Sequence, residues 1–297
     1  MARRLKLAGL IDLLWVEQPR EILELAQDRR LDREFLPQGP WLNRLLARGI
    51  RRHLQLDGQP LPPLAPIGDE RPNAAQITLA QSLEGPPCSQ ADLEALAAYV
   101  ARGNTLDGPG VLVQGIVGRL FNGDYRADPQ SYRDACLLDT AARTLNPWRQ
   151  WRWRRSGDVD QARARLAEKV DRDPVALHAT AIAVHNLVAA LERMRRLAME
   201  RPRTLAHITP AAAASRCLAA PGTVLRQART HGNHAVGSFA PGTLILFRLE
   251  TARARSLRHD VAFLTHTWSR CPAAAWAPRL LSEAWRKAGK MMPAQGG

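Results

Sequence analysis

The stretch from Asp173-Pro174 to Pro202 constrains the fold most, because no residue between the two prolines breaks a helix. Ala, Leu, Met, Glu and Arg dominate it, and these residues favour helix. Asp173 supplies an N-cap and Pro174 suits the first helical position. The sequence therefore predicts one long helix over 174–202. Its first half, residues 175–190, is apolar nearly all round, which indicates burial within a larger body.

Length and composition indicate a folded, water-soluble chain. The 297 residues are 45% hydrophobic and 24% charged, and no apolar run reaches the length of a membrane span. The basic N-terminus resembles the start of a signal peptide, but Asp12 and Glu17 interrupt the apolar stretch that follows, so we expect a cytoplasmic protein. The net charge of +14 suits a nucleic acid, an acidic protein partner or solubility alone.

Elsewhere the pattern predicts a mainly α fold with a small β-region, in a single domain over 1–297. Helices are expected over 20–26, over 41–55, after the Ser89-x-x-Asp92 capping box and after Asp128-Pro129. After Pro210, glycines separate short β-prone pieces, of which residues 243–247 make the best strand. The apolar stripe of the 41–55 helix is Trp41, Leu42, Leu45, Leu46, Ile50 and Leu54.

The segment 259–279 carries the most chemistry. Cys271 directly precedes Pro272, which predicts a cysteine at the start of a helix, where unsatisfied N–H groups stabilise a thiolate. A thiolate held by backbone donors is a strong axial ligand for haem iron. The four cysteines show no disulfide or zinc spacing, and the other three are expected in a loop (Cys88), a helix (Cys136) and a strand (Cys217).

This segment resembles the haem-binding signature of the cytochrome P-450 superfamily, in which a Phe precedes the ligand cysteine. Phe263, Cys271-Pro272 and the small residues 273–277 match that arrangement. Upstream, residues 239–246 resemble the Pro-x-Gly-Thr strand entry of the family, and residues 210–216 resemble its Pro-to-Arg stretch. The long helix stands where the family has its central distal helix.

The resemblance implies a cytochrome P-450-like fold that binds haem b. Residues 174–297 would hold the distal helix, the small β-region and the ligand segment, and residues 1–173 would form a compressed, divergent helical part. Cys271 would be the iron ligand and Arg216 the haem-propionate partner, with His259 and Phe263 also at the cofactor. Catalytic roles would fall to His185 and Asn186, which stand where the family has an acid–alcohol pair that delivers protons. His178 lies seven residues before His185, a spacing that predicts one shared helix face.

The expected function is a haem-thiolate oxidoreductase, a cytochrome P-450-like monooxygenase of a small organic substrate in a specialised bacterial pathway. A ferredoxin or flavodoxin would supply electrons, attracted by Arg270, Arg279, Arg286 and Lys287. Replacement of the acid–alcohol pair favours a first alternative, a haem-thiolate enzyme without monooxygenation, such as an isomerase, a dehydratase or a peroxide-using enzyme. A non-enzymatic basic binding protein that lost haem is the second alternative.

A block of alternating Trp and Arg over 148–155 stands apart from this resemblance. Such a block could stack on nucleic-acid bases, which we weight least, or lie on an anionic membrane surface. It could also form an ordinary helix or loop whose tryptophans pack inward while the arginines stay solvated.

Overall fold

The computed structural model describes residues 3–68, 77, 79–81, 83–102, 108–144, 146–200 and 208–291. The chain forms two compact units, and each is assembled from three segments that are distant in the sequence. Unit 1 comprises Met1–Gln76, Thr140–Asp158 and Ala220–Cys271, and unit 2 comprises Ile77–Asp139, Val159–Ala219 and Pro272–Gly297.

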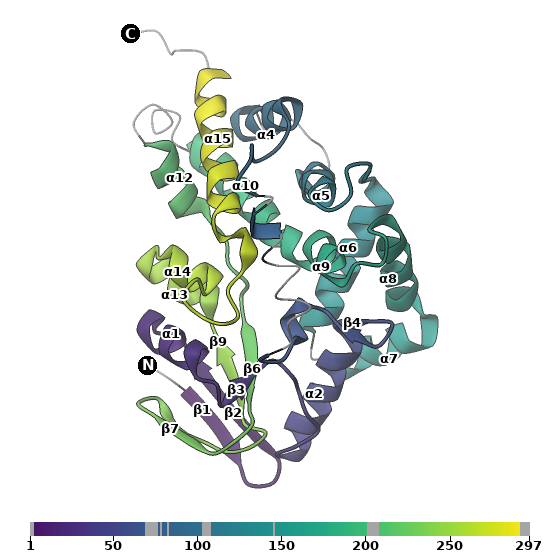
Figure 1. Cartoon of the computed structure of the whole chain (residues 1–297), viewed down its shortest axis with the longest axis vertical. Helices are drawn as coiled ribbons and strands as arrows, with labels where there is room; N and C mark the ends of the chain where they lie inside the picture. The colour runs from purple at the N-terminus through teal and green to yellow at the C-terminus, as the bar shows by residue number, and fades with distance from the viewer. Residues whose placement is uncertain are drawn as a thin grey trace. The chain divides into compact units, whose positions relative to one another are not determined.

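Unit 1 is organised by a five-stranded sheet that joins strands within residues 3–32 to strands within residues 224–247. Its strand order is β1 (Arg3–Leu7), β2 (Ile11–Val16), β9 (Leu244–Phe247), β6 (Val224–Ala228) and β3 (Leu31–Asp32). Strands β2 and β9 run parallel, whereas the other neighbours run antiparallel. Figure 1 shows the purple N-terminal strands beside the green β6 and β9. The strand predicted over 243–247 is confirmed as β9.

The N-terminal hairpin was not expected, because the sequence pattern predicted a helical first half of the chain. Strand β1 alternates charged and apolar residues, but its leucines are exposed, with Leu5 at 41% and Leu7 at 52%. Its partner β2 is nearly all buried. Gly9 makes the turn with a φ of +69°, a conformation that glycine adopts without strain.

Helices and small hairpins surround the sheet of unit 1. Helices α1 (Pro19–Gln27), α13 (Leu249–Ser256) and α14 (His259–Phe263) pack together, and α2 (Trp41–His53) packs on β2. The helix predicted over 20–26 is thus confirmed. The remaining elements are β4 (Gln55–Leu56), β5 (Gln59–Pro60), the 3₁₀ turn η1 (Pro62–Leu64), α7 (Pro147–Ser156), β7 (Gly232–His234) and β8 (Gly237–Phe239).

Helix α2 turns a different face to the sheet from the one its apolar stripe predicted. Asn43, Ala47 and His53 are buried, whereas Trp41 is 54% exposed and Leu45 is 50% exposed. The reason is polar: the Asn43 amide bonds the backbone of Asp12 and donates to the Gly242 carbonyl, at 2.7–3.2 Å. These bonds fix the rotation of the helix, so the stripe expectation was wrong for Trp41 and Leu45.

Unit 2 is helical. It contains α4 (Gln90–Arg102), α5 (Gly110–Arg119), α6 (Pro129–Arg143), α8 (Asp158–Lys169), α12 (Pro210–Cys217), the 3₁₀ turn η3 (Pro272–Ala274) and α15 (Trp276–Met291). Helix α15 packs against α4 and α12. The N-cap half of the box predicted at Ser89 is confirmed, because the Ser89 hydroxyl accepts from the Asp92 N–H at 3.1 Å. The Asp92 carboxylate accepts from the Ser89 hydroxyl at 2.7 Å. Cys217 ends α12, so its expected place on a strand was wrong.

The long predicted helix is confirmed as the centre of unit 2. It consists of α9 (Pro174–His178), a π-helical turn η2 (Ala179–Ala183) and α10 (Val184–Glu200), capped at its start by the Asp173 carboxylate. Its expected end at Pro202 lies outside the described residues. By length and composition alone the helix could cross a membrane, but half of its most apolar window is buried and α10 packs against α4, α5 and α12, as a core helix does.

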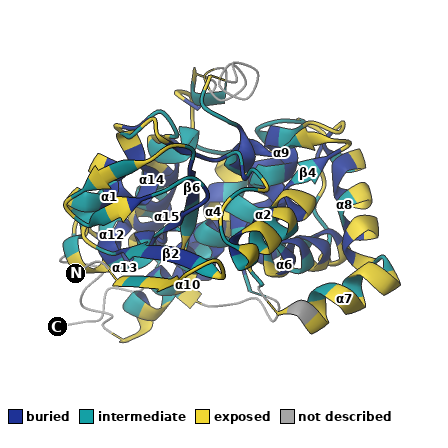
Figure 2. Ribbon diagram, turned by 90° about the horizontal axis from the view of Figure 1, so that it is seen from below, coloured by how far each residue is buried: buried dark blue, intermediate teal, exposed yellow. Residues whose placement is uncertain are grey.

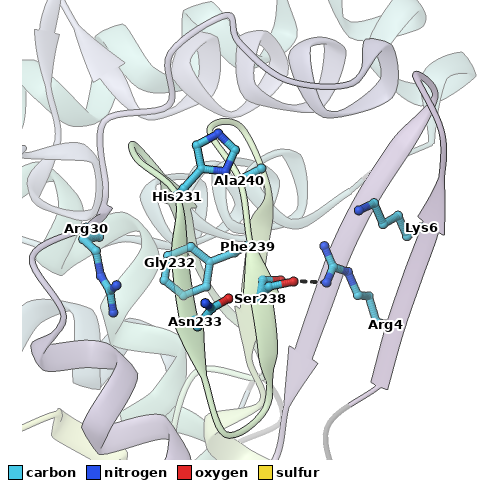
Figure 3. Close-up of a pocket in the computed structure, with 9 residues that line it drawn as sticks. All are labelled: Arg4, Lys6, Arg30, His231, Gly232, Asn233, Ser238, Phe239 and Ala240. Atoms are coloured by element: carbon cyan, nitrogen blue, oxygen red, sulfur yellow. Dashed lines mark hydrogen bonds between the residues drawn. The ribbon is translucent and has the colours of Figure 1, made fainter.

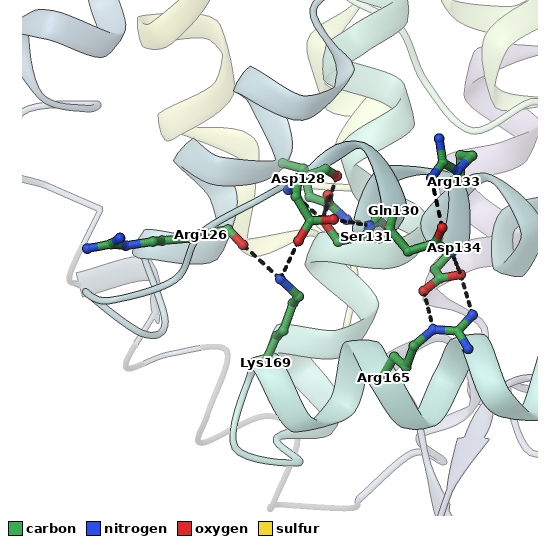
Figure 4. Close-up of polar contacts among 9 residues, drawn as sticks. Arg126, Asp128, Gln130, Ser131, Arg133, Asp134, Arg165 and Lys169 are labelled. Atoms are coloured by element: carbon green, nitrogen blue, oxygen red, sulfur yellow. Dashed lines mark hydrogen bonds and ion pairs between the residues drawn. The ribbon is translucent and has the colours of Figure 1, made fainter.

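Ion pairs tie α6 to α8 (Figure 4). The Asp128 carboxylate accepts from the Ser131 N–H at the start of α6 and pairs with Lys169 at 2.7 Å. Nearer the core, the buried Asp134 receives two bonds from Arg165, at 2.8 and 2.7 Å. The cap predicted at Asp128-Pro129 is therefore confirmed, and the same carboxylate anchors the neighbouring helix.

Candidate functional site

The cysteine segment lies at the end of unit 1. Helix α14 ends at Phe263, which is buried, and Leu264 turns the chain in the left-handed conformation. The chain then returns on itself, because the Cys271 N–H donates to the Phe263 carbonyl at 2.8 Å. Phe263 and Cys271, separated by eight positions in the sequence, are thus brought together. The Cys271 side chain is half-buried.

The helix expected directly after Cys271 begins later. Pro272 opens the three-residue 3₁₀ turn η3, and α15 starts only at Trp276. A 3₁₀ turn provides few aligned peptide groups, so the positive end of the α15 dipole lies further along the chain than predicted. Donors for a Cys271 thiolate must therefore come mainly from the loop.

Two buried arginines flank the indole ring of Trp268 in the same segment. The guanidinium carbons of Arg33 and Arg226 lie 4.7 and 5.5 Å from the ring centroid. The Arg226 Nη atoms donate to the Leu225 carbonyl and the Ser269 hydroxyl, both at 2.7 Å. Each arginine exposes only 3–5% of its surface.

Arg226 is a buried cation whose hydrogen-bond donors are only partly satisfied by protein groups. Its Nε has no hydrogen-bond partner, and within the described residues no carboxylate forms an ion pair with it. Asp32, the carboxylate that acts on it electrostatically, is bonded to Arg229 at 2.8 Å. Burial, and next the charge of Arg33, hold the pKa of Arg226 well below its ordinary value. This arrangement fits an external anion.

Sequence reasoning missed this pair and assigned the propionate role to Arg216. Arg216 lies on α12 in unit 2, whereas Arg226 lies in unit 1 with the cysteine segment. One signal was present in the sequence, because Arg226 interrupts the β-prone run Val224–Ala228. A charged residue in a buried strand needs a counter-charge, and it marks a functional candidate.

His259 begins α14 and is half-buried. Burial is the largest influence on its imidazole and lowers its pKa from the ordinary value, with Arg253 adding to the effect and Asp260 opposing it. Within the described residues, no group of three or more His, Cys, Asp or Glu side chains could hold a metal ion. A haem iron needs only one protein ligand, which a single cysteine can supply.

The residues expected on the distal side lie in unit 2. His185 and Asn186 begin α10 directly after the π turn, and both are half-buried. Single π turns inside helices often occur at functional sites, since they displace the residues that follow. The turn lies between His178 and His185, so it also changes the helical phase on which their shared face depended.

His185 also has an unsatisfied ring nitrogen. Its imidazole lies 5.7 Å from the Tyr132 ring, centroid to centroid, and its buried Nε2 has no hydrogen-bond partner in the described part of the chain. Burial raises the pKa of Tyr132, so this neighbour stays a neutral phenol. A ring nitrogen in this position can accept or donate a proton to a bound ligand or water.

Three of the four basic residues expected to receive an acidic redox protein make bonds within unit 2. Arg279 donates to the carbonyls of residues 83–85, Arg286 pairs with Glu283, and Lys287 pairs with Glu94 at 2.8 Å. Pairing with carboxylates reduces the charge that a partner would meet. Arg270, in unit 1, forms no ion pair among the described residues.

A basic pocket of about 560 Å³ opens in unit 1 between β1 and the β7–β8 hairpin (Figure 3). Arg4, Lys6, Arg30 and His231 line it beside the Phe239 ring. Arg4 is paired with Asp12 and Arg30 with Asp28. Much of the positive charge is therefore already neutralised by the protein.

Comparison with known proteins identifies the architecture. No family model and no curated protein matches the chain. Solved structures do match. P450BioI in complex with an acyl carrier protein ligated to hexadec-9Z-enoic acid aligns over 97% of this chain and 87% of its own, with a TM-score of 0.65 and 13% identity.

Two further solved structures agree. The cytochrome P-450 enzyme CxnD, for C–S bond formation in chuangxinmycin biosynthesis, aligns over 93% of this chain and 79% of its own, with a TM-score of 0.61 and 12% identity. Cytochrome P-450 OleT in complex with arachidonic acid aligns over 96% and 82%, with a TM-score of 0.60 and 12% identity. The mainly helical chain with its small sheet therefore has a cytochrome P-450 fold.

Proposed function

We propose that the chain is a haem-thiolate oxidoreductase in which Cys271 ligates the iron of haem b. The observation that carries the proposal is the buried Arg226 guanidinium, which lies in the cysteine unit and lacks a carboxylate partner among the described residues. Haem propionates are the anions that such a group would bind. When bound, the haem supplies one-electron and oxygen chemistry, tuned by thiolate donation.

The protein groups have separate roles in this proposal. Arg226 and Arg33 hold the propionates, with Arg216 and His259 as further candidates for contact with the cofactor. Phe263 fixes the ligand loop through the bond from the Cys271 N–H. Two of the other thiols are less suited to ligation: burial raises the pKa of Cys88 to about 11 and also raises the pKa of Cys136, which keeps both protonated.

His185 supplies or accepts the proton at its free Nε2, and Asn186 orients a water or a substrate group. A histidine in this position also supports the alternative of a haem-thiolate enzyme without monooxygenation, since imidazole acid–base chemistry serves isomerases, dehydratases and peroxide-using enzymes as well. The substrate we propose is a small organic molecule, which accords with the fatty-acid ligand of OleT. A ferredoxin or flavodoxin would be the electron donor of a cytoplasmic, bacterial enzyme.

The test is spectroscopic. Full-length protein expressed with haem supplied is expected to show, when reduced and exposed to carbon monoxide, the red-shifted Soret band of thiolate-bound haem. Cys271→Ala is expected to abolish the band, whereas Cys88→Ala, Cys136→Ala and Cys217→Ala retain it. Absence of any Soret band in folded wild-type protein would overturn the proposal and favour a basic binding protein that has lost haem.

A further inference from the structure

The block of alternating Trp and Arg over 148–155 lies at the surface of unit 1. It forms helix α7, capped at its start by the Asn146 side chain and at its end by Gly157 in the left-handed conformation. Trp148 is 76% exposed and Trp151 is 54% exposed. The alternative in which the tryptophans pack inward is therefore wrong for Trp148 and Trp151, and Figure 2 shows α7 largely in the colour of exposed residues.

One face of α7 is aromatic and basic. Trp148, Trp151, Arg152 and Arg155 are spaced three and four residues apart, which places them on one side of the helix. The two indoles meet edge to face at 6.4 Å, and the Arg155 guanidinium lies 5.7 Å from the Trp151 ring. These contacts hold the side chains in an outward array.

Helix α2 lies beside α7. The Gln150 amide of α7 lies against Gly49 of α2, where an added methyl group would stand 3.7 Å from it. The exposed ridge of α2 carries Trp41 and Leu45 together with four exposed arginines, Arg44, Arg48, Arg51 and Arg52. We name the exposed residues of these two helices the α2–α7 surface.

The charge of the α2–α7 surface is entirely positive. Each helix contains four arginines and no acidic residue, and all eight arginines are exposed. In the described part of the chain, none of the eight forms an ion pair. Charge of one sign beside exposed indoles suits a partner that is both anionic and apolar at its boundary.

We propose that the α2–α7 surface docks on an anionic lipid bilayer. Arginines would bind the headgroups, and Trp41, Leu45, Trp148 and Trp151 would enter the boundary with the acyl chains, where amphipathic indoles concentrate. These four side chains are 50–76% exposed, which suits contact with a flat bilayer. Single-stranded nucleic acid is usually held in a groove.

The test is sedimentation of the full-length protein with vesicles. The protein is expected to bind vesicles of phosphatidylcholine mixed with phosphatidylserine and not those of phosphatidylcholine alone. Binding should fall as salt rises from about 0.1 M to about 1 M, where the Debye length shrinks from ~10 to ~3 Å. Equal binding to both vesicles would overturn the proposal.

Charge variants locate the surface. Replacing Arg149, Arg152 and Arg155 with Gln should lower partitioning roughly 100-fold, since each arginine near an anionic membrane contributes about fivefold. The matched control replaces three exposed arginines elsewhere, Arg29, Arg126 and Arg133, with Gln and should leave binding unchanged. Equal loss in both triple variants would mean that net charge alone drives binding, which overturns the assignment to α7.

Aromatic variants and a competitor complete the test. Trp148→Ser with Trp151→Ser should lower partitioning at least roughly tenfold, because apolar area leaves the bilayer, and should remove quenching by brominated lipid. Wild-type binding to a single-stranded oligonucleotide that is stronger than to anionic vesicles at the same salt would overturn the lipid proposal in favour of nucleic acid. None of these residues belongs to the proposed haem site, so a failure here leaves the Soret test untouched.

Discussion

Arg226 shows how a single residue can mark a binding site through its cost to folding. Its guanidinium is buried, its pKa is lowered by burial, and its Nε is unsatisfied. Replacing Arg226 with Met should therefore raise the free energy of unfolding of haem-free protein by about 1 kcal/mol, because an incompletely compensated buried charge is removed. The same variant should retain less haem, measured as the ratio of Soret to protein absorbance.

Chemical denaturation of haem-free protein measures the first effect. A matched variant, Arg229→Met, removes a cation that does have carboxylate partners, Asp32 and Glu34, and should instead destabilise the fold. If Arg226→Met destabilised haem-free protein as strongly as Arg229→Met, Arg226 would be a structural residue and the anion argument would fail.

His259 makes the stability of unit 1 depend on pH in the acidic range. Because burial lowers its pKa below the ordinary 6.5, the folded state favours the neutral imidazole. The stability that this provides is complete above pH 6.5 and is lost as pH falls from 6.5 through the folded-state pKa. In His259→Gln the free energy of unfolding should fall less steeply between about pH 7 and pH 5. His231→Gln, which changes an exposed histidine, should keep the wild-type slope.

At the scale of elements, two short helices end on strained residues. Leu257 closes α13 and Leu264 closes α14, both in the left-handed conformation with φ of 53° and 50°. A glycine at Leu257 should raise the free energy of unfolding by about 0.5–1 kcal/mol, since a left-handed non-glycine residue costs roughly 1–2 kcal/mol and glycine's greater unfolded entropy offsets part of that.

At Leu264, burial of the side chain reverses the sign of the expected change in the free energy of unfolding. Leu257 is 48% exposed, whereas Leu264 is only 4% exposed. Leu264→Gly should lower the free energy of unfolding by about 1–3 kcal/mol, because a lost core leucine outweighs the relieved strain. Thermal unfolding of both variants checks the pair, and stabilisation by both would show that the Leu264 side chain contributes little packing.

The elements that the sequence predicted correctly are those with strong local signals. The long helix lies between proline signals and has a capping aspartate, and β9 is a run of apolar and β-branched residues. The hairpin of β1 and β2 depends instead on pairing with residues more than two hundred positions away, and a local pattern does not report such pairing. The face of α2 was wrong because one buried amide, Asn43, outweighs an apolar stripe.

The candidate site likewise contains residues that a local motif predicted and residues that it did not predict. Cys271 and Phe263 were identified from a local motif, and the structure joins them by a backbone bond. The π turn before His185 and the pair of Arg33 and Arg226 around Trp268 could not be predicted, since the turn breaks the helical period and the arginines are far apart in the sequence. The interruption of the β-prone run Val224–Ala228 could have drawn attention to Arg226 but gave no partner for it.

At the scale of the whole molecule, unit 1 depends on contacts between segments that are far apart in the chain. Asn43 joins three of them: its amide bonds both backbone groups of Asp12 on β2 and the carbonyl of Gly242 before β9. Thr243 adds a bond from its hydroxyl to the Asp12 carboxylate at 2.7 Å. Such contacts close long loops, so they form late and at high entropic cost.

Asn43→Ala should therefore weaken unit 1 as a whole. Asn43 is fully buried, and its loss removes the partner of one N–H and two carbonyl groups. Because each unsatisfied buried group costs roughly 1–3 kcal/mol, the free energy of unfolding should fall by about 3 kcal/mol or more. Asn233→Ala, at an exposed asparagine, should change it by less than about 0.5 kcal/mol. Limited proteolysis followed by mass spectrometry should show new cleavage in the N-terminal hairpin and at β9 in Asn43→Ala, because both lose their common anchor. Cleavage confined to α2 would instead mean that the amide serves its own helix, and the sheet would then be held by strand pairing alone.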